Sequence, residues 1–248
     1  MSEGQSIAAA TAAIGGAPAP VLLLDACALL DVVRMPKRTQ LNAPGVREAR
    51  RLCAESSAPA RHVWLVVSAI VKREFAAHVE SVEKEIVAHV RGIDEGLARI
   101  LAVLDVLAPG QPTALASQYL GSCGLAGQLR DLATRMVDLA LVLDEDEACL
   151  RLGRRRVVDD RPPASKGKSE YKDCEIVEHY LALAKALRAA GFAEPCILVS
   201  SNTRDYRVLG PTADAAFAAE LRTAGLSFVT DIVWARSQSG GHTSWRAR

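Results

Sequence analysis

The sequence predicts an α/β fold in which helices cover both faces of a central parallel sheet, giving three layers. Two observations predict it. First, four short runs rich in Val, Ile and Leu have the composition of strands buried on both faces. They are Val21–Leu24, Val63–Val67, Cys196–Ser200 and Ser227–Thr230. Second, long helical patterns separate the first three runs, and parallel strands require crossovers of that kind.

The chain is expected to form one elaborated domain between two flexible tails. Residues 1–19 are rich in Ala, Gly and Ser but lack the positively charged start of a secretory signal. They are interpreted as a flexible N-terminal tail, and residues 235–248 as a flexible C-terminal tail. Residues 20–234 are expected to be one domain, because a chain of 248 residues can bury a full core.

A helical insertion is predicted around residues 80–150. Apolar residues recur there at three- and four-residue steps, which is the spacing of one helix face. The first stretch contains Ile86, Val90, Ile93, Leu97, Ile100, Leu101 and Leu104; the second, after Pro109 and Pro112, contains Leu125, Leu129, Leu132, Met136, Leu139 and Leu143. The insertion is expected to pack on the sheet, with an oligomer or partner face as the alternative.

Composition excludes several classes of protein. Half of the residues are hydrophobic, but no stretch approaches the roughly 18–20 uninterrupted apolar residues of a membrane span. Aromatic residues are only 4% of the chain, which disfavours a base-stacking RNA-binding platform. The six cysteines are scattered without the paired spacing of a zinc site. They are interpreted as buried, reduced thiols of a cytoplasmic protein.

Four acidic residues are expected to meet at one edge of the sheet, because the carboxyl ends of parallel strands lie together. Asp25 directly follows the first strand, and Asp205 lies in the loop that leaves the third. Asp173 opens the helix that returns to the third strand, and Glu74 lies about two turns into the helix after the second. Like charges brought together in this way usually require a divalent cation. The pattern therefore points to metal-dependent phosphodiester chemistry.

These acids stand in strings that resemble the motifs of a PIN domain. The strings are VLLLDACALLDVV (21–33), VVSAIVKREF (66–75), YKDCEIVEHY (171–180) and LVSSNTRDY (198–206), and GLSFVTDIV (225–233) is similar to the last strand of that fold. The resemblance covers most of residues 20–234. It implies a three-layer PIN-like fold and a Mg²⁺- or Mn²⁺-dependent nuclease, mostly a ribonuclease and often the toxin of a toxin–antitoxin pair. It also favours a homodimer.

The resemblance assigns a role to each acidic position. Asp25, Glu74 and Asp173 match the three core acids, which would hold one or two Mg²⁺ or Mn²⁺ ions. The fourth position differs. Many members have Ser or Thr, any residue, then Asp, whereas this chain has Ser200, Ser201 and Asn202, followed by Asp205 three residues later. Ser200, Ser201 and Asn202 are expected to orient water or phosphate, and Asp205 to act as a fourth carboxylate.

Net charge is only +1, so contacts to an RNA backbone would have to come from a local group of cations. The candidate is the Lys- and Arg-rich stretch 151–172, which leads directly into the third acidic motif. Its predicted RNA-backbone residues are Arg154, Arg155, Arg156, Arg161, Lys166, Lys168 and Lys172. The alternative is an ordinary solvated loop.

Two other acids and two other functions complete the predictions. Asp31 is expected on the exposed side of the helix after the first strand, and Glu178 is expected either to support the site or to have a structural role, rather than to contact metal. The main alternative function is a PIN-like module that no longer cuts and binds RNA or protein. A flap-type DNA nuclease is the other alternative, but its additional acids and helix-hairpin-helix do not appear in the sequence.

Overall fold

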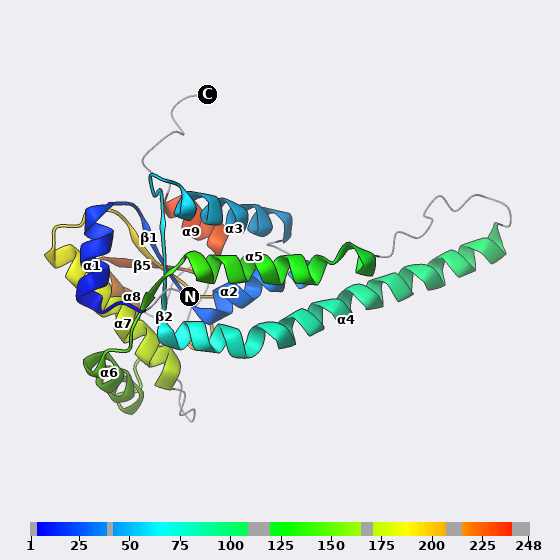
Figure 1. Cartoon of the computed structure of the whole chain (residues 1–248). Helices are drawn as coiled ribbons and strands as arrows, with labels where there is room; N and C mark the ends of the chain where they lie inside the picture. The colour runs from blue at the N-terminus through cyan, green and yellow to red at the C-terminus, as the bar shows by residue number, and fades with distance from the viewer. Residues whose placement is uncertain (1–3, 39–41, 109–119, 165–170, 207–214, 240–248) are drawn as a thin grey trace.

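The computed structural model describes residues 4–38, 42–108, 120–164, 171–206 and 215–239. Its centre is an all-parallel sheet of five strands in the order β3-β2-β1-β4-β5. Helices lie on both sides of the sheet (Figure 1). The predicted three-layer α/β architecture is therefore confirmed.

Each strand is short and apolar, and the central three are buried throughout. The pairing of β1 with β4 runs from Val21 opposite Cys196 to Leu24 opposite Val199, so these two strands end at the same level. That register brings the residues that follow the two strands together. The strands are β1 (Val21–Leu24), β2 (Trp64–Ser68), β3 (Leu141–Leu143), β4 (Cys196–Val199) and β5 (Leu226–Val229).

The helices form two groups around the sheet. On one side α2 packs against α4 and α5, and α3 packs against α5 and α9; on the other, α7 packs against α1 and α6 (Figure 1). The α-helices are α1 (Ile7–Gly16), α2 (Ala26–Val33), α3 (Asn42–Ser57), α4 (Ala69–Leu107), α5 (Leu125–Leu139), α6 (Glu147–Val158), α7 (Tyr171–Ala189), α8 (Ala215–Thr223) and α9 (Ile232–Ser239). The 3₁₀ helices within the described residues are η1 (Met35–Lys37) and η2 (Leu120–Cys123).

The prediction that residues 1–19 form a flexible tail is wrong for the described residues 4–19. Ser6 caps α1 by accepting a hydrogen bond from the backbone N–H of Ala9, and Ala10 and Ile14 are fully buried. The backbone of Gln5 also pairs beside β3. Ala is the best helix former, and its small side chain lets two helices approach closely. The same Ala content that suggested a tail therefore builds a helix packed on α7.

The predicted C-terminal tail also begins too early. Helix α9 runs to Ser239, and Ile232 and Ala235 are buried. Arg236 donates a hydrogen bond to Glu55 of α3 at 2.7 Å, which ties this helix to the body. Residues 240–248 lie outside the described residues.

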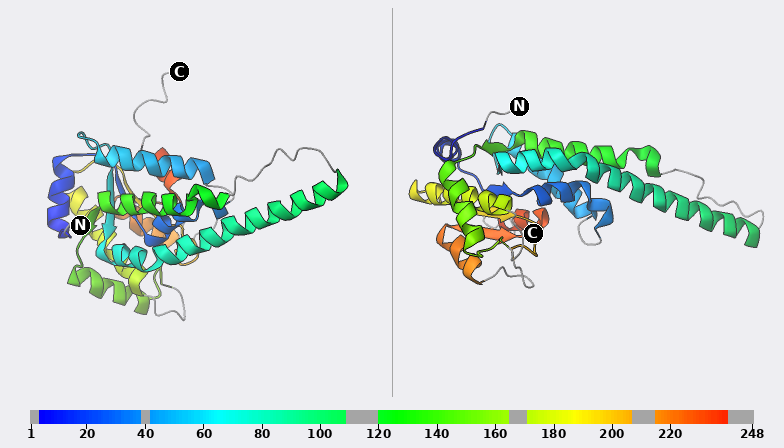
Figure 2. Two further views of the ribbon diagram at one scale, coloured as in Figure 1. Left: turned by 45° about the vertical axis from the view of Figure 1, so that its right-hand side comes forward. Right: turned by 90° about the horizontal axis from the view of Figure 1, so that it is seen from below.

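The helical insertion is confirmed, with one added strand. Ser68 caps α4, whose 39 residues continue without interruption to Leu107. Val82 and Ile86 in its inner half are buried, whereas its outer half extends away from the body and exposes apolar side chains (Figure 2). The second helical stretch ends at Leu139, and Leu141–Leu143 is strand β3 rather than helix. A three-residue apolar run has too few residues to show either period.

All six cysteines are free. The prediction that they are buried is confirmed for four, but it is wrong for Cys27, which is half-buried, and for Cys123, which is exposed. In the described part of the chain, no helix is both long enough and apolar enough to span a membrane.

Candidate active site

The four acids predicted to meet at the sheet edge line one cavity of about 350 Å³. They reach it from four separate segments: the end of β1, helix α4, the start of α7 and the loop after β4. The wall also contains Cys27 and Tyr171, which were not predicted, and Lys172, which was predicted to contact the RNA backbone. The lining residues are Asp25, Cys27, Glu74, Tyr171, Lys172, Asp173, Asn202 and Asp205.

Asp25 occupies the junction between β1 and α2. Its backbone N–H continues the sheet by donating to Val199, and its Oδ1 accepts a hydrogen bond of 2.7 Å from the N–H of Ala26. Its Oδ2 accepts from the Ser200 hydroxyl at 2.6 Å and from the Cys27 thiol at 3.0 Å. The carboxylate therefore has a fixed orientation. The equal ends of β1 and β4 explain why Ser200 reaches it.

Burial raises the pKa of Asp25 above its usual value, although the hydrogen bonds from Ser200, Cys27 and Ala26 act in the opposite direction. The cause is desolvation, which disfavours the charged form of a carboxyl group. Burial also raises the pKa of the Cys27 thiol, and the negative charge of Asp25 adds to this effect. A nearby cation would reverse the effect on Asp25, because opposite charge favours the carboxylate.

The loop after β4 joins two of the acids through Asn202. The Nδ2 group of Asn202 donates to Asp205 at 2.8 Å and to Asp173 at 3.2 Å. Its Oδ1 accepts from the N–H of Asp205, and its own N–H donates to Ser200. Asn202 thus holds both carboxylates in one place, at the position where the resemblance predicts an acid. Ser200 supports this loop and Asp25 together, but neither Ser200 nor Ser201 lines the cavity.

The remaining two acids come from helices. Asp173 lies in the first turn of α7, where the helix dipole favours a negative charge. Glu74 is half-buried on α4, close enough to the start of that helix to reach the rim. A buried tyrosine fixes the strands below them: the hydroxyl of Tyr180 donates to Leu24 at 2.5 Å and accepts from the N–H of Ser68 at 3.2 Å. This residue was missed because its role depends on contacts between distant segments.

The chemistry of the cavity fits a hard divalent cation. Mg²⁺ and Mn²⁺ prefer oxygen ligands, which four carboxylates and the side-chain amide of Asn202 can provide. Over the described residues, no three His, Cys, Asp or Glu side chains already lie at metal-binding spacing. Asn202 donates to one carboxylate oxygen of Asp173 and to one of Asp205, and each carboxylate has a second oxygen.

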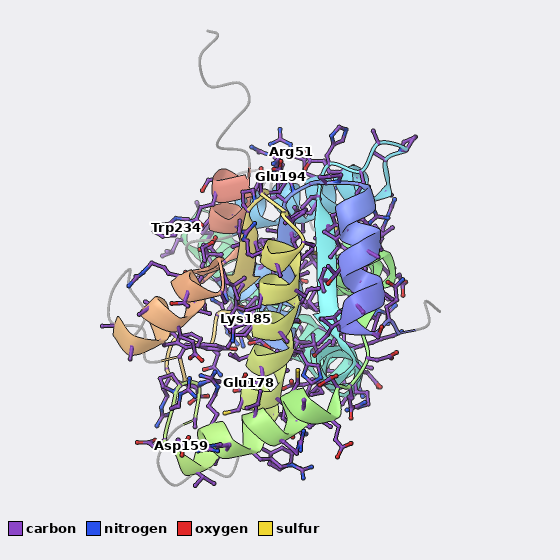
Figure 3. All side chains as sticks on the ribbon, turned by 90° about the vertical axis from the view of Figure 1, so that its left-hand side faces the viewer. Arg51, Asp159, Glu178, Lys185, Glu194 and Trp234 are labelled. Carbon is purple, nitrogen blue, oxygen red and sulfur yellow. The ribbon has the colours of Figure 1, made fainter. Side chains whose placement is uncertain are left out.

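The prediction that Arg156 contacts an RNA backbone is wrong. Its side chain extends from α6 and is fully buried. It donates to Glu178 of α7, to Glu220 of α8 and to the carbonyl of Pro162. Helix α6 crosses α7 near Glu178 (Figure 3). Gly153 allows this close approach, since a Cβ there would lie 2.6 Å from the side chain of Glu175. Glu178 therefore supports the fold and does not contact the cavity.

The other predicted RNA-backbone residues differ in position. Arg154 is exposed and lines a neighbouring cavity, and Lys172 lines both that cavity and the acidic one. Arg155 is exposed and forms an ion pair with Asp159 one turn later, whereas Arg161 pairs with Glu220. Lys166 and Lys168 lie outside the described residues.

Asp31 is buried rather than exposed, contrary to its prediction. Its carboxylate forms ion pairs with Arg38 at 2.5 Å and with Arg34 at 4.0 Å. The helix α2 is covered by α4 and α5, so it has no broad solvent-facing side. Asp31 therefore belongs to the packing of α2 and not to the acidic cavity.

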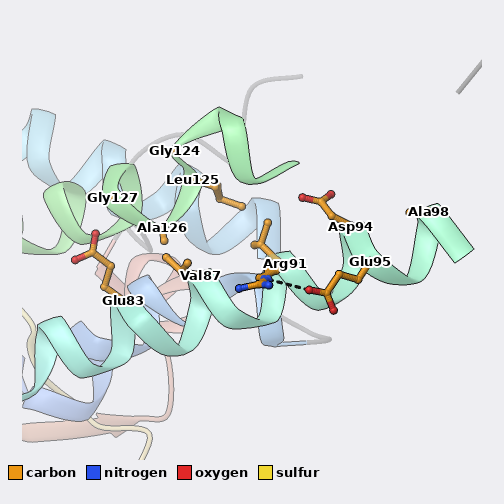
Figure 4. A pocket seen from close by; sticks show the side chains of 11 residues that line it. Glu83, Val87, Arg91, Asp94, Glu95, Ala98, Gly124, Leu125, Ala126 and Gly127 are labelled. Atoms are coloured by element: carbon orange, nitrogen blue, oxygen red, sulfur yellow. Dashed lines mark hydrogen bonds and ion pairs between the residues drawn. The ribbon is translucent and has the colours of Figure 1, made fainter. Parts of the chain in front are cut away.

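A larger cavity, of about 820 Å³, lies between α4 and α5 (Figure 4). Its wall includes Val87, Val90 and Leu125, and an ion pair of 2.8 Å joins Arg91 to Glu95 at its rim. None of the residues that meet at the sheet edge lines it. Cavity size alone therefore does not single out the sheet edge, where the four acids lie.

Comparison of the chain with models of protein families, with curated proteins and with solved structures finds no match in any of the three. Inference about function therefore rests on the residues of the acidic cavity and on their surroundings.

Proposed function

We propose that this protein is a metal-dependent endoribonuclease that hydrolyses RNA phosphodiester bonds. The observation that carries the proposal is the meeting of Asp25, Glu74, Asp173 and Asp205 around one cavity at the carboxyl edge of the sheet. Such a cluster of carboxylates has no obvious value for stability, because like charges repel. Its usual use is to hold the divalent cations that hydrolyse phosphodiesters.

Each residue has a distinct task in this proposal. Asp25, Glu74 and Asp173 would hold one or two Mg²⁺ or Mn²⁺ ions, with Asp205 as a fourth carboxylate. The bound metal would supply an activated water and neutralise negative charge on the phosphate. Ser200 keeps Asp25 in position through its bond of 2.6 Å. Asn202, released from its acids, would present its amide to the water or the phosphate.

A specific observation favours a second candidate, a PIN-like module that binds RNA or protein without cutting. The side-chain amide of Asn202 donates to Asp173 and to Asp205 at once. These two hydrogen bonds can hold the two carboxylates together without a bound metal. Metal-dependent cleavage separates the two candidates.

The experiment is incubation of the purified protein with a mixed RNA pool in Mg²⁺, Mn²⁺ or EDTA, with cleavage read at nucleotide resolution. Cleavage in either metal that stops in EDTA and in the Asp25→Asn variant supports the nuclease. Asp159→Asn is the matched control, because Asp159 is an acid at the end of α6 outside the cavity lining. RNA binding without cleavage under all three conditions supports the second candidate.

The proposal extends to partners and location. A toxin-type nuclease requires an antitoxin protein and acts in the cytoplasm, where free thiols such as those of this chain stay reduced. A homodimer would cover the apolar side chains that the outer half of α4 exposes, among them Ile100, Val106 and Leu107. Sedimentation of the purified protein tests the dimer, and co-purification of a second protein from the native host tests the antitoxin.

A further inference from the structure

A second cavity, of about 410 Å³, adjoins the acidic one and shares Glu74, Tyr171 and Lys172 with it. Its other walls come from α4 on one side and from α6 and α7 on the other. We refer to it as the α4–α6 cavity. Because the two cavities share a wall, a chain molecule seated at the acids can continue directly into this one.

The α4–α6 cavity presents cations that are available to a phosphate. Arg73 of α4 and Arg154 of α6 both line it, with side chains that are 65% and 69% exposed. Arg73 forms an ion pair with Glu145, and Arg154 forms one of 3.7 Å with Glu175. Exposed pairs of this kind contribute little to stability. A guanidinium group also has five donors, so each arginine can keep its carboxylate and bind a phosphate as well.

An aromatic side chain stands where the two cavities meet. Tyr171 is the first residue of α7, lines both cavities and is 47% exposed. An exposed aromatic ring beside phosphate-binding cations is the arrangement that single-stranded nucleic acids use, since each unpaired base can stack on it. A base inside a duplex is already stacked and cannot do so.

We infer that the α4–α6 cavity binds a segment of single-stranded RNA next to the bond at the acidic site, with phosphates against Arg73 and Arg154 and one base against Tyr171. This inference rests on the proposed function, because the bound segment is placed relative to the RNA bond at the acidic cavity. It goes further by naming the path that the strand takes and the side chains that contact it. Arg73 and Tyr171 were not among the predicted RNA-contact residues.

The test is the affinity of the full-length protein in EDTA for a fluorescent single-stranded RNA, measured by anisotropy over a range of salt concentrations. Arg73→Gln and Arg154→Gln should each reduce the slope of log affinity against log salt by about 0.7, the effect of one lost phosphate contact. Arg155→Gln is the matched control. It removes the same charge from α6, the helix that carries Arg154, and Arg155 lines neither cavity although the sequence predicted it as an RNA contact.

Tyr171→Ala should weaken binding about 5- to 150-fold, the effect of one lost base stack, without changing the salt slope. The control is Trp234→Ala, because Trp234 is an aromatic residue of α9 with a similar exposure of 51%. A duplex of the same sequence should show no loss of affinity with Tyr171→Ala. Thermal melts of each variant establish that it is folded.

The inference is overturned if Arg73→Gln and Arg154→Gln have the same slope as Arg155→Gln, or if Tyr171→Ala binds as tightly as Trp234→Ala. Its failure is distinguishable from failure of the nuclease proposal. Metal-dependent cleavage with unchanged salt slopes in the variants refutes the strand path alone. Variant-sensitive binding without cleavage in Mg²⁺ or Mn²⁺ refutes the nuclease and leaves the strand path supported.

Discussion

Replacement of Arg156 by Met is expected to lower the free energy of unfolding by about 3–5 kcal/mol, the cost of breaking a buried ion pair by removing one partner. The structure explains why the loss in free energy of unfolding is large. Arg156 is fully buried and donates to both Glu178 and Glu220. Burial alone would lower the pKa of Arg156, but these two carboxylates outweigh it and raise the pKa. Without Arg156, the carboxylate of Glu178 remains buried without its partner.

Urea denaturation at pH 7 measures the loss directly, and a thermal melt should show a decrease of about 6–20 °C, at about 2–4 °C per kcal/mol for a protein of this size. Arg155→Met is the control and should change stability by no more than about 0.5 kcal/mol, because Arg155 is 77% exposed. A double variant, Arg156→Met with Glu178→Met, should recover part of the loss, since an apolar pair can replace a buried ionic one. The reasoning is refuted if Arg156→Met melts like Arg155→Met.

Three further predictions concern the site and the N-terminal helix. In EDTA, Asp25→Asn should melt at a higher temperature than the wild type at pH 7. The raised folded pKa of Asp25 means that the wild type loses stability as pH rises from the usual value of 3.8 through the folded pKa, so this gain should vanish below pH 3.8. For metal dependence, Asp205→Asn should raise the Mg²⁺ concentration for half-maximal cleavage by about 10–100-fold, and Asn202→Asp in the same chain should partly restore it; a Mg²⁺ titration in which Asp205→Asn has no effect removes Asp205 from the site. Finally, Ile14→Ala should destabilise the protein by about 2–5 kcal/mol in urea denaturation, because Ile14 is fully buried; an unchanged midpoint would mean that α1 does not pack.

The meeting of the acids at the sheet edge could be predicted, because it follows from where each acid lies relative to the strands along the chain. Asp25 directly follows β1, and parallel strands bring their carboxyl ends together in any α/β fold. The strand pattern of Val, Ile and Leu located four of the five strands. The fifth, Leu141–Leu143, has three residues and no distinguishing period, so only its pairing with β2 identifies it as a strand.

The side chains that were predicted wrongly or missed share one property: their burial or position depends on contacts between distant segments. Arg155 and Arg156 are neighbours in one run of arginines, yet Arg156 is buried against Glu178 of α7 and Glu220 of α8, whereas Arg155 is exposed. Asp31 was placed on an exposed face because its burial depends on α4 and α5. Tyr171 was missed for a similar reason. Its place between two cavities follows from the position of α4 and α6, which a local sequence pattern does not contain.

The claim that acids at the sheet edge hold a divalent cation is tested most directly by Mn²⁺ binding, which does not depend on knowing the RNA. Titration of the protein with Mn²⁺, followed by electron paramagnetic resonance of the free ion, gives the number and affinity of the sites. The account predicts one or two sites in the wild type and in the exposed control Asp159→Asn, with binding weakened at least tenfold in Asp25→Asn and in Asp173→Asn. Equal binding by all four proteins, or none by the wild type, would contradict it.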